Sequence, residues 1–210
     1  VGFLQAQNCS NYPAAWRHRD AAQDFLSPRY YQRIAQTLED GKFHLAFFDD
    51  RLAMPDIFGN DHAESVRNGV RVVKMDPVPI MAAMGAVTQS IGLGATCSTT
   101  YYEPFHVART FATLDHMTNG RAGWNVVTSL NDSEARNMGA DKALPHDKRY
   151  DRADEFMQVV MGHWHAWAPD AISADRDTGE FADPEKVTRL DHRGEWFNSR
   201  GPFTVPPSVQ

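Results

Sequence analysis

The stretch that decides the fold is Arg121-Ala-Gly-Trp-Asn-Val-Val-Thr-Ser-Leu-Asn131, followed after a loop by His146-Asp-Lys-Arg-Tyr150. Its apolar run Ala122–Val127 is short and rich in strand-forming residues, which predicts a fully covered β-strand. His146 and Tyr150 are four positions apart, so a helix that begins there carries both on one face. The free N–H groups and the dipole at a helix start favour an anion. This strand end and helix start therefore predict a site for a phosphorylated ligand.

The same order of strand and helix occurs three times before this stretch. Apolar segments at residues 2–6, 43–48 and 91–97 read as strands, and each is followed by a helix whose start is marked by Ser27-Pro28, Asp76-Pro77 or Glu103-Pro104. Four strand–helix units in series with near-continuous apolar strands predict a parallel sheet with both faces covered. Four units are half of an eight-unit barrel, so we expect that the remaining units exist elsewhere.

Composition narrows the class of protein. The 210 residues are 42% hydrophobic and 23% charged, as in ordinary globular domains, and the net charge of −6 argues against nucleic acid or an anionic membrane as the main partner. No apolar run approaches the roughly 18 residues that span a bilayer. The N-terminus lacks the features of a signal peptide. Two cysteines, Cys9 and Cys97, are too few for a disulfide framework, which predicts a reduced, cytoplasmic setting.

After residue 166 the alternation of strands and helices stops. Residues 170–186 are polar and contain proline and glycine, which predicts a surface insertion. Val187-Thr-Arg-Leu190 and Glu195-Trp-Phe-Asn198 flank Asp191-His-Arg-Gly194, which predicts a hairpin with its turn at the four middle residues. We therefore divide the chain into residues 1–166, the N-terminal half of a barrel, and residues 167–210, an insertion leading toward the second half. Residues 51–74 show no clear period.

Several motifs invite a functional interpretation that their context does not support. Gly92-Leu-Gly94 lacks the third glycine and the helix start of a dinucleotide fingerprint. His163-Trp-His165 falls near a helix end, where polar side chains contact the last carbonyls, and no matching ligand set predicts a metal. Of Asp49 and Asp50, at most one faces a barrel interior, because adjacent strand residues point to opposite faces. No side chain is assigned as a catalytic acid, base or nucleophile.

Polar side chains gather where the predicted strands end. Asp50, Thr96 and Asn125 lie at or near the carboxyl ends of three strands, and His146 and Tyr150 lie at the following helix start. In barrels of alternating strands and helices these ends face the active site, so we expect the five residues on one rim. Three aromatic residues on the strands either line an apolar pocket or belong to the ordinary core; they are Phe3, Phe47 and Trp124.

At these residues the sequence resembles a known family. The resemblance is carried by Ala15–His18, Tyr30-Tyr31, Gly92–Thr96, Tyr101-Tyr102, Phe105–Arg109, Phe111–Asp115, Arg121–Asn131, Tyr150–Phe156 and Gly194–Pro202. Together they are similar to the bacterial luciferase-like flavin monooxygenases, in the branch of the nitrilotriacetate and dibenzothiophene sulfone monooxygenases. The likeness covers nearly the whole chain and is most specific between residues 101 and 156.

The resemblance implies a (β/α)₈ TIM barrel, of which this chain covers about the first four units plus an insertion. It implies reduced FMN as cosubstrate, delivered by a separate NAD(P)H:flavin reductase, O₂ as oxidant, and a homo-oligomer. Asp50, Thr96, His146 and Tyr150 match the FMN-contacting positions of the family, and Asn125 joins them from its strand. Phe3 and Phe47 are candidates for the substrate pocket from their strand positions, and this role does not come from the resemblance.

Two other functions stay open from the sequence. A flavin-binding protein without turnover would keep the same binding residues. A deazaflavin-dependent oxidoreductase on the same barrel would transfer hydride and need no O₂. The sequence does not discriminate among the possible substrates, which include sulfones and aminopolycarboxylates.

Overall fold

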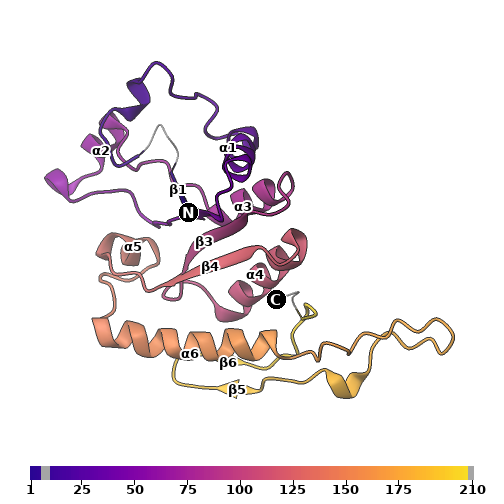
Figure 1. Cartoon of the computed structure of the whole chain (residues 1–210). Coiled ribbons are helices and arrows are strands. Elements are labelled where there is room, and N and C mark those ends of the chain that lie inside the picture. Colours follow the sequence, from indigo (N-terminus) through magenta and orange to yellow (C-terminus); the bar gives the residue numbers. More distant parts are fainter. Residues whose placement is uncertain (6–9, 208–210) are drawn as a thin grey trace.

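The computed structural model describes residues 1–5 and 10–207, and at its centre lies a parallel sheet in the order β1-β2-β3-β4 (Figure 1). The strands are β1 (Gly2–Leu4), β2 (Leu45–Phe48), β3 (Gly92–Ser98) and β4 (Ala122–Val127). Each strand after β1 pairs in parallel with the strand before it in the chain, which confirms the predicted series of parallel strands. Residue 6 of the first predicted strand and Cys9 lie outside the described residues.

Four longer helices follow the strands, and their starts are those that the sequence predicts. They are α1 (Pro28–Asp40), α3 (Pro77–Gly85), α4 (Pro104–Thr118) and α6 (His146–Trp164). The Ser27 side chain accepts a hydrogen bond from the Arg29 amide, and the Asp76 side chain accepts one from the Val78 amide. Such caps satisfy first-turn N–H groups that have no partner within the helix. None of the described helices combines the length and apolar character that crossing a membrane requires.

Shorter elements occupy segments in which the sequence shows no period. Helix α2 (Ala63–Asn68) lies within residues 51–74, and α5 (Asp132–Asn137) lies in the predicted loop after β4. Single 3₁₀ turns are present at Ala15–Arg17, Phe58–Asn60 and Pro184–Lys186. Helices of six residues are less than two turns long, so they are too short to show a repeating apolar stripe.

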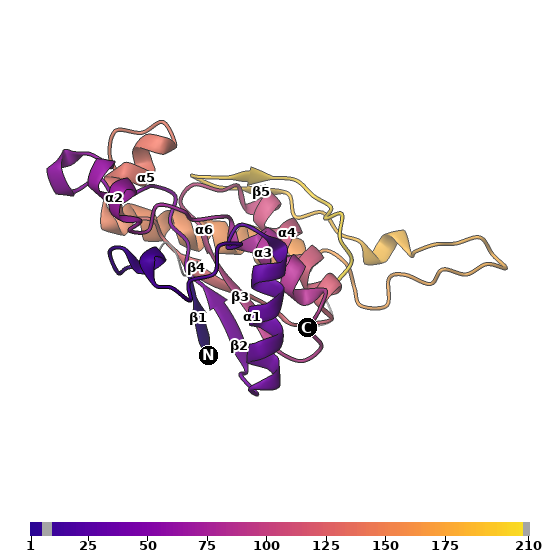
Figure 2. The same ribbon diagram turned by 90° about the horizontal axis from the view of Figure 1, so that it is seen from above.

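The main core lies between one face of the sheet and the helices. Figure 2 shows α1, α3 and α4 following one another along one side of the strands, as expected when consecutive parallel strands are joined by right-handed crossovers. Leu93 and Ala95 of β3 are fully buried on this side, together with Met81, Met84 and Phe156 from the helices.

The opposite face of the sheet is less covered than predicted. Phe3, Phe47, Gly94, Thr96 and Asn125 share this face, since they are paired across the strands in register. The side chain of Phe3 is 56% exposed and Asn125 is exposed as well. The prediction of a sheet covered on both faces is therefore wrong at Phe3 and Asn125, because the connecting helices lie on the other side, whereas Gly94 and Thr96 are buried.

Strand β4 also differs from its prediction. It forms over Ala122–Val127 as expected, but it is the edge strand of the sheet and Val126 is 43% exposed. The prediction of a fully covered strand is wrong here, because no strand of the described residues pairs with the outer edge of β4.

Residues 168–186 extend away from the rest of the molecule as a long loop (Figure 1). Most are exposed, in agreement with a surface insertion, and the two sides meet at an isolated bridge between Ile172 and Ala182. The boundary predicted between residues 166 and 167 falls just after α6 and stays a prediction.

The predicted hairpin exists with a different register. β5 (His192–Arg193) pairs with the antiparallel β6 (Asn198–Ser199), and the Gly194 amide donates to the Phe197 carbonyl at 3.0 Å. The turn thus spans residues 194–197, so the predicted turn at residues 191–194 is wrong. The Glu155 carboxylate of α6 accepts from the amides of Trp196 and Phe197, and these contacts fix the turn at its actual position.

Candidate active site at the strand ends

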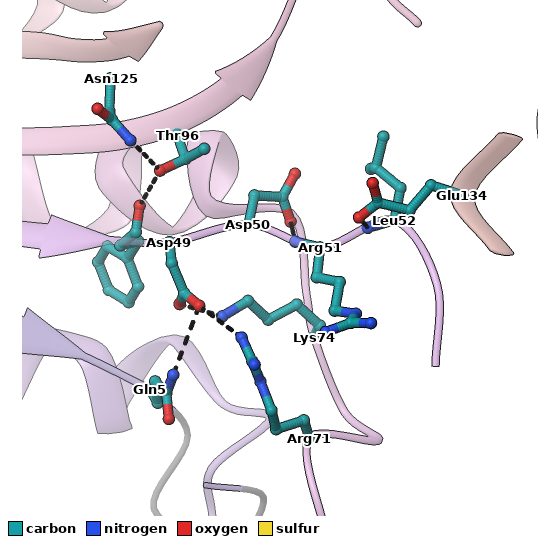
Figure 3. Close-up of polar contacts among 11 residues, drawn as sticks. Gln5, Asp49, Asp50, Arg51, Leu52, Arg71, Lys74, Thr96, Asn125 and Glu134 are labelled. Atoms are coloured by element: carbon teal, nitrogen blue, oxygen red, sulfur yellow. Dashed lines mark hydrogen bonds and ion pairs between the residues drawn. The ribbon is translucent and has the colours of Figure 1, made fainter. Parts of the chain in front are cut away.

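Thr96 and Asn125 join three strand ends directly. The Asn125 Nδ2 group donates to Thr96 Oγ1 at 2.9 Å, and the Thr96 hydroxyl donates to the Phe48 carbonyl at 2.9 Å (Figure 3). Thr96 is buried, whereas Asn125 is exposed on the uncovered face of the sheet. The predicted proximity of these two residues is confirmed. The amide oxygen of Asn125 has no hydrogen-bond partner in the described part of the chain, so it can serve a ligand.

Asp49 and Asp50 take different roles just after β2. Asp49 accepts hydrogen bonds from Arg71 at 3.1 Å, from Gln5 at 3.4 Å and from Lys74, and it ties residues 71–74 to the sheet (Figure 3). Among the described residues, Asp50 accepts a hydrogen bond only from the amide of its neighbour Arg51, at 2.8 Å. Burial raises the pKa of Asp50 above its ordinary value. Asp49 is therefore a structural residue, and Asp50 is the carboxyl group available to a ligand.

His146 and Tyr150 share one face at the start of α6, as predicted. Their ring centroids are 4.8 Å apart, and both side chains are exposed, that of Tyr150 by 52%. The His146 ring contacts the Asp147 carboxylate at 2.8 Å. Neither residue is part of the core, so both remain accessible beside the first amides of a 19-residue helix.

Two arginines hold this helix start against the strand ends. Arg149 donates to the Ser129 carbonyl after β4 at 3.3 Å, and Arg152 donates to the Thr99 carbonyl after β3. The helix start and the ends of β3 and β4 therefore belong to one side of the molecule. No contact joins His146 or Tyr150 to Thr96 or Asn125 among the described residues, so the structure brings four of the predicted residues together as two separate pairs. Asp50 lies near the first pair, two residues after the Phe48 carbonyl that Thr96 contacts.

The aromatic residues of the strands divide between two faces. Phe3 and Phe47 stack with ring centroids 5.6 Å apart on the uncovered face. A Cβ atom added at Gly94 would lie 3.4 Å from the Phe47 ring, and glycine leaves the surface beside the rings flat. Trp124 instead stacks on Phe111 at 5.3 Å in the helix-covered core. The pocket interpretation therefore remains for Phe3 and Phe47, while the core interpretation holds for Trp124.

His163 is a structural residue, although not as the sequence suggests. It is fully buried, and its Nε2 atom contacts the Ser199 hydroxyl at 2.7 Å. It therefore links α6 to β6 and does not contact the last carbonyls of its own helix. Within the described residues no cluster of histidine, cysteine and acidic side chains is arranged to hold a metal ion.

The sequence did not identify Arg51, Glu134 and Asn137 as residues near the site. Glu134 is buried and accepts the Leu52 amide at 3.2 Å, while Asn137 donates to the Leu52 carbonyl at 2.7 Å. Both lie on α5. The Asn131-x-x-Glu134 spacing is a signal of a helix start that could have revealed this element.

The chain is similar in sequence to a known protein family and to several of its members. Residues 8–210 match the sequence model of a family described as luciferase-like monooxygenase. The dibenzothiophene-sulfone monooxygenase of Rhodococcus erythropolis is 54% identical over 211 residues, which cover 100% of this chain and 47% of that protein. Component A of the nitrilotriacetate monooxygenase of Aminobacter aminovorans is 41% identical over 203 residues, which cover 95% of this chain and 44% of that protein.

A solved structure shows the same arrangement of strands and helices. A riboflavin lyase, solved with modified FMN and its substrate riboflavin, matches with a TM-score of 0.91 at 37% identity, covering 100% of this chain and 47% of that one. The chain thus spans about half the length of these relatives. The match confirms the predicted α/β barrel class for the parallel sheet and its helices.

Proposed function

The chain belongs to the luciferase-like monooxygenase family, and on this premise we propose that it is part of an FMN-dependent, two-component monooxygenase. Such an enzyme uses reduced FMN and O₂ to oxygenate a small organic substrate such as a sulfone or an aminopolycarboxylate. The names of the relatives support this proposal, because one acts on a dibenzothiophene sulfone and another is component A of a nitrilotriacetate monooxygenase.

The observation that carries the proposal is the polar rim at the strand ends. Asp50, Thr96 and Asn125 would hold the ring system and ribityl chain, since they offer a carboxyl group, a hydroxyl and an amide on or beside three adjacent strand ends. His146 and Tyr150 would hold the ribityl-phosphate side, because they are exposed at a helix start whose N–H groups and dipole favour an anion. These donors and acceptors fit the groups of FMN.

When bound, reduced FMN supplies the electrons for the reaction with O₂, and the protein residues bind and orient it. We assign Phe3 and Phe47 to the substrate side. Their stacked rings and the neighbouring glycine form a flat apolar surface on the same face as Thr96 and Asn125. A planar or apolar part of a substrate would pack there beside the flavin.

The partner in this proposal is a separate NAD(P)H:flavin reductase that delivers reduced FMN. The designation of one relative as component A supports a second component. O₂ uptake in the presence of enzymatically reduced FMN and a candidate substrate tests the monooxygenase activity. Flavin binding without O₂ uptake would favour a binding protein, and anaerobic oxidation of a reduced deazaflavin would favour the hydride-transfer enzyme.

The residue assignments are tested by His146→Ala and Tyr150→Ala in the intact protein. We expect each to weaken reduced-FMN binding at least about tenfold, since a hydrogen bond to a charged group is worth roughly 1.5–3 kcal/mol. Anaerobic fluorescence titration measures the affinity. His62→Ala and Tyr12→Ala are matched controls, because both residues are exposed and lie outside the rim. Wild-type affinity in both rim variants would contradict the assignment.

A further inference from the structure

A cavity lies next to Asp50, between the segment after β2 and the residues that precede α3. Its volume is about 380 Å³. The apolar part of its wall consists of Leu52, Ala53, Met54 and Val72. The charged residues of the lining are Asp50, Arg51, Lys74 and Asp76, and Tyr102 and Asn137 complete it. The cavity can therefore take a ligand that combines a short hydrocarbon part with a polar group.

Most charged groups of this lining already have partners. Lys74 pairs with Asp49, which is not part of the cavity wall. The Asp76 carboxylate caps α3 by accepting the Val78 amide at 2.9 Å. Asp50 accepts the Arg51 amide. Asp50 and Asp76 are each bonded to a backbone amide, which carries no net charge. Both carboxylates therefore remain negative charges in the cavity wall.

The Arg51 guanidinium is the uncommitted cation of the lining. It makes no ion pair within the described residues, and its Nε atom is buried without a hydrogen-bond partner. In Figure 3 the dashed line at Arg51 reaches only its backbone nitrogen, whereas the side chains of Lys74 and Arg71 both reach Asp49. A buried N–H group without a hydrogen-bond acceptor is energetically unfavourable. An acid group of a ligand would supply the acceptor that the protein does not.

Helix α5 keeps the Arg51 side of the cavity in place. Glu134 and Asn137 hold the N–H and C=O groups of Leu52, the residue after Arg51, and Arg136 pairs with Asp56 at 3.2 Å. The backbone that follows Arg51 is thus held in place by α5. The planar guanidinium group can donate two parallel hydrogen bonds, which favours recognition of two acceptor oxygens of an acid.

We propose that this cavity binds the carboxylate or sulfonate group of an organic-acid substrate, with its acid oxygens on Arg51 and its hydrocarbon part against Leu52, Ala53, Met54 and Val72. The proposal rests on the proposed function and names a substrate class for it. Repulsion by Asp50 is partly offset by the Arg51 amide, whose hydrogen bond the Asp50 carboxylate accepts. Asp76 is partly compensated by the α3 amide that it caps.

The test uses small probes and the intact protein. Benzoate and benzenesulfonate are titrated by calorimetry beside their neutral counterparts benzamide and methyl phenyl sulfone. We expect an acid to bind at least tenfold more tightly than its neutral counterpart. The preference should disappear in Arg51→Met, persist in part in Arg51→Lys, and be unchanged in Arg67→Met, which alters an exposed arginine of α2. Thermal unfolding checks that each variant is folded.

Two results would overturn the proposal. One is a neutral probe, the sulfone included, that binds as tightly as its acid counterpart. The other is an acid affinity that Arg51→Met leaves unchanged. Reduced FMN is titrated separately with the wild-type protein. If FMN binds and the acid preference is absent, the substrate class is wrong and the monooxygenase proposal stands. If FMN does not bind, the proposed function fails, and the acid titrations still decide what the cavity recognises.

Discussion

At the scale of single residues, Thr96 shows how one hydroxyl joins three neighbouring strands. It donates to the carbonyl of β2 and accepts from the side chain of β4 while remaining buried in β3. Because its hydrogen is committed to Phe48, Thr96 offers a ligand only acceptor capacity. Asn125 is then the exposed partner of the pair that can turn toward a ligand.

His163 predicts a dependence of stability on pH. Burial lowers the pKa of His163, and its Nδ1 atom is buried without a hydrogen-bond partner among the described residues. The folded state therefore favours the neutral ring relative to the unfolded chain, whose ordinary pKa is about 6.5. The contribution of this residue to stability is fully present above about pH 6.5 and is lost as the pH falls toward the folded-state pKa.

We expect the free energy of unfolding to fall between about pH 7 and about pH 5, with His163 contributing at most about 1.4 kcal/mol per pH unit. Urea titrations at several pH values measure this slope. His163→Leu should reduce it, whereas His165→Leu should not, since His165 is exposed two positions away. Identical slopes in wild type and His163→Leu would refute the assignment.

Cys97 predicts a thiol that is inert in the folded protein. It is buried in β3, and burial raises its pKa to about 12, so almost no thiolate forms near neutral pH. In a Cys9→Ser variant, we expect no reaction with a disulfide reagent at about pH 8 until guanidinium unfolds the chain. Absorbance of the released thiolate follows the reaction. Rapid labelling of one thiol under native conditions would contradict this expectation.

At the scale of elements, the hairpin and α6 act as one unit. Glu155 accepts the amides of Trp196 and Phe197 at 3.0 and 2.8 Å and contacts His192 at 3.1 Å. The Arg152 guanidinium lies 4.5 Å from the Phe197 ring centroid and donates to Thr99 after β3. The hairpin thereby supports the same helix that carries His146 and Tyr150.

Glu155→Gln should destabilise this unit by about 1.5–3 kcal/mol, because the change removes the charge and places an amide group near backbone donors. Chemical denaturation measures the loss, and exchange of the Trp196 and Phe197 amides locates it. Glu195→Gln is the matched control in the exposed turn of the same hairpin and should have little effect. Equal stability of the two variants would show that Glu155 does not hold the hairpin.

At the scale of the whole molecule, the outer edge of β4 borders an apolar groove of about 880 Å³. Its lining includes Trp124, Val126, Met157, Met161, Trp164 and Trp167. An exposed strand edge beside apolar side chains promotes association with other chains. A polypeptide of residues 1–210 produced by itself should therefore self-associate with rising concentration.

Sedimentation velocity over a range of concentrations measures this association. Val126→Lys should reduce it, because a lysine on the edge strand opposes pairing. Val66→Lys is the control, since Val66 is similarly exposed on α2, away from the groove. A polypeptide that remains monomeric at high concentration, or two variants with equal association, would disprove the expectation.

Local sequence patterns predicted the longer helices and strands well. The Ser27-Pro28 and Asp76-Pro77 signals mark helices that begin where expected, because caps and fixed proline angles act within one turn. Helices α2 and α5 were not predicted, since six residues carry too little periodicity. The hairpin register was wrong because Glu155, about 40 positions earlier in the chain, fixes the turn.

The sequence by itself determined the series of parallel strands, the helix starts and the proximity of Thr96 to Asn125, because these depend on periodicity, on capping within a few residues and on the position of strand ends. Only the tertiary structure decided which of those residues are available. Asp49 is bound by Arg71 and Lys74, Trp124 lies in the core, and Arg51 is left without a partner. These differences arise from residues that are distant in the chain and close in space. The burial of a side chain and the pairing of its charge depend on all its spatial neighbours, which local sequence patterns do not show.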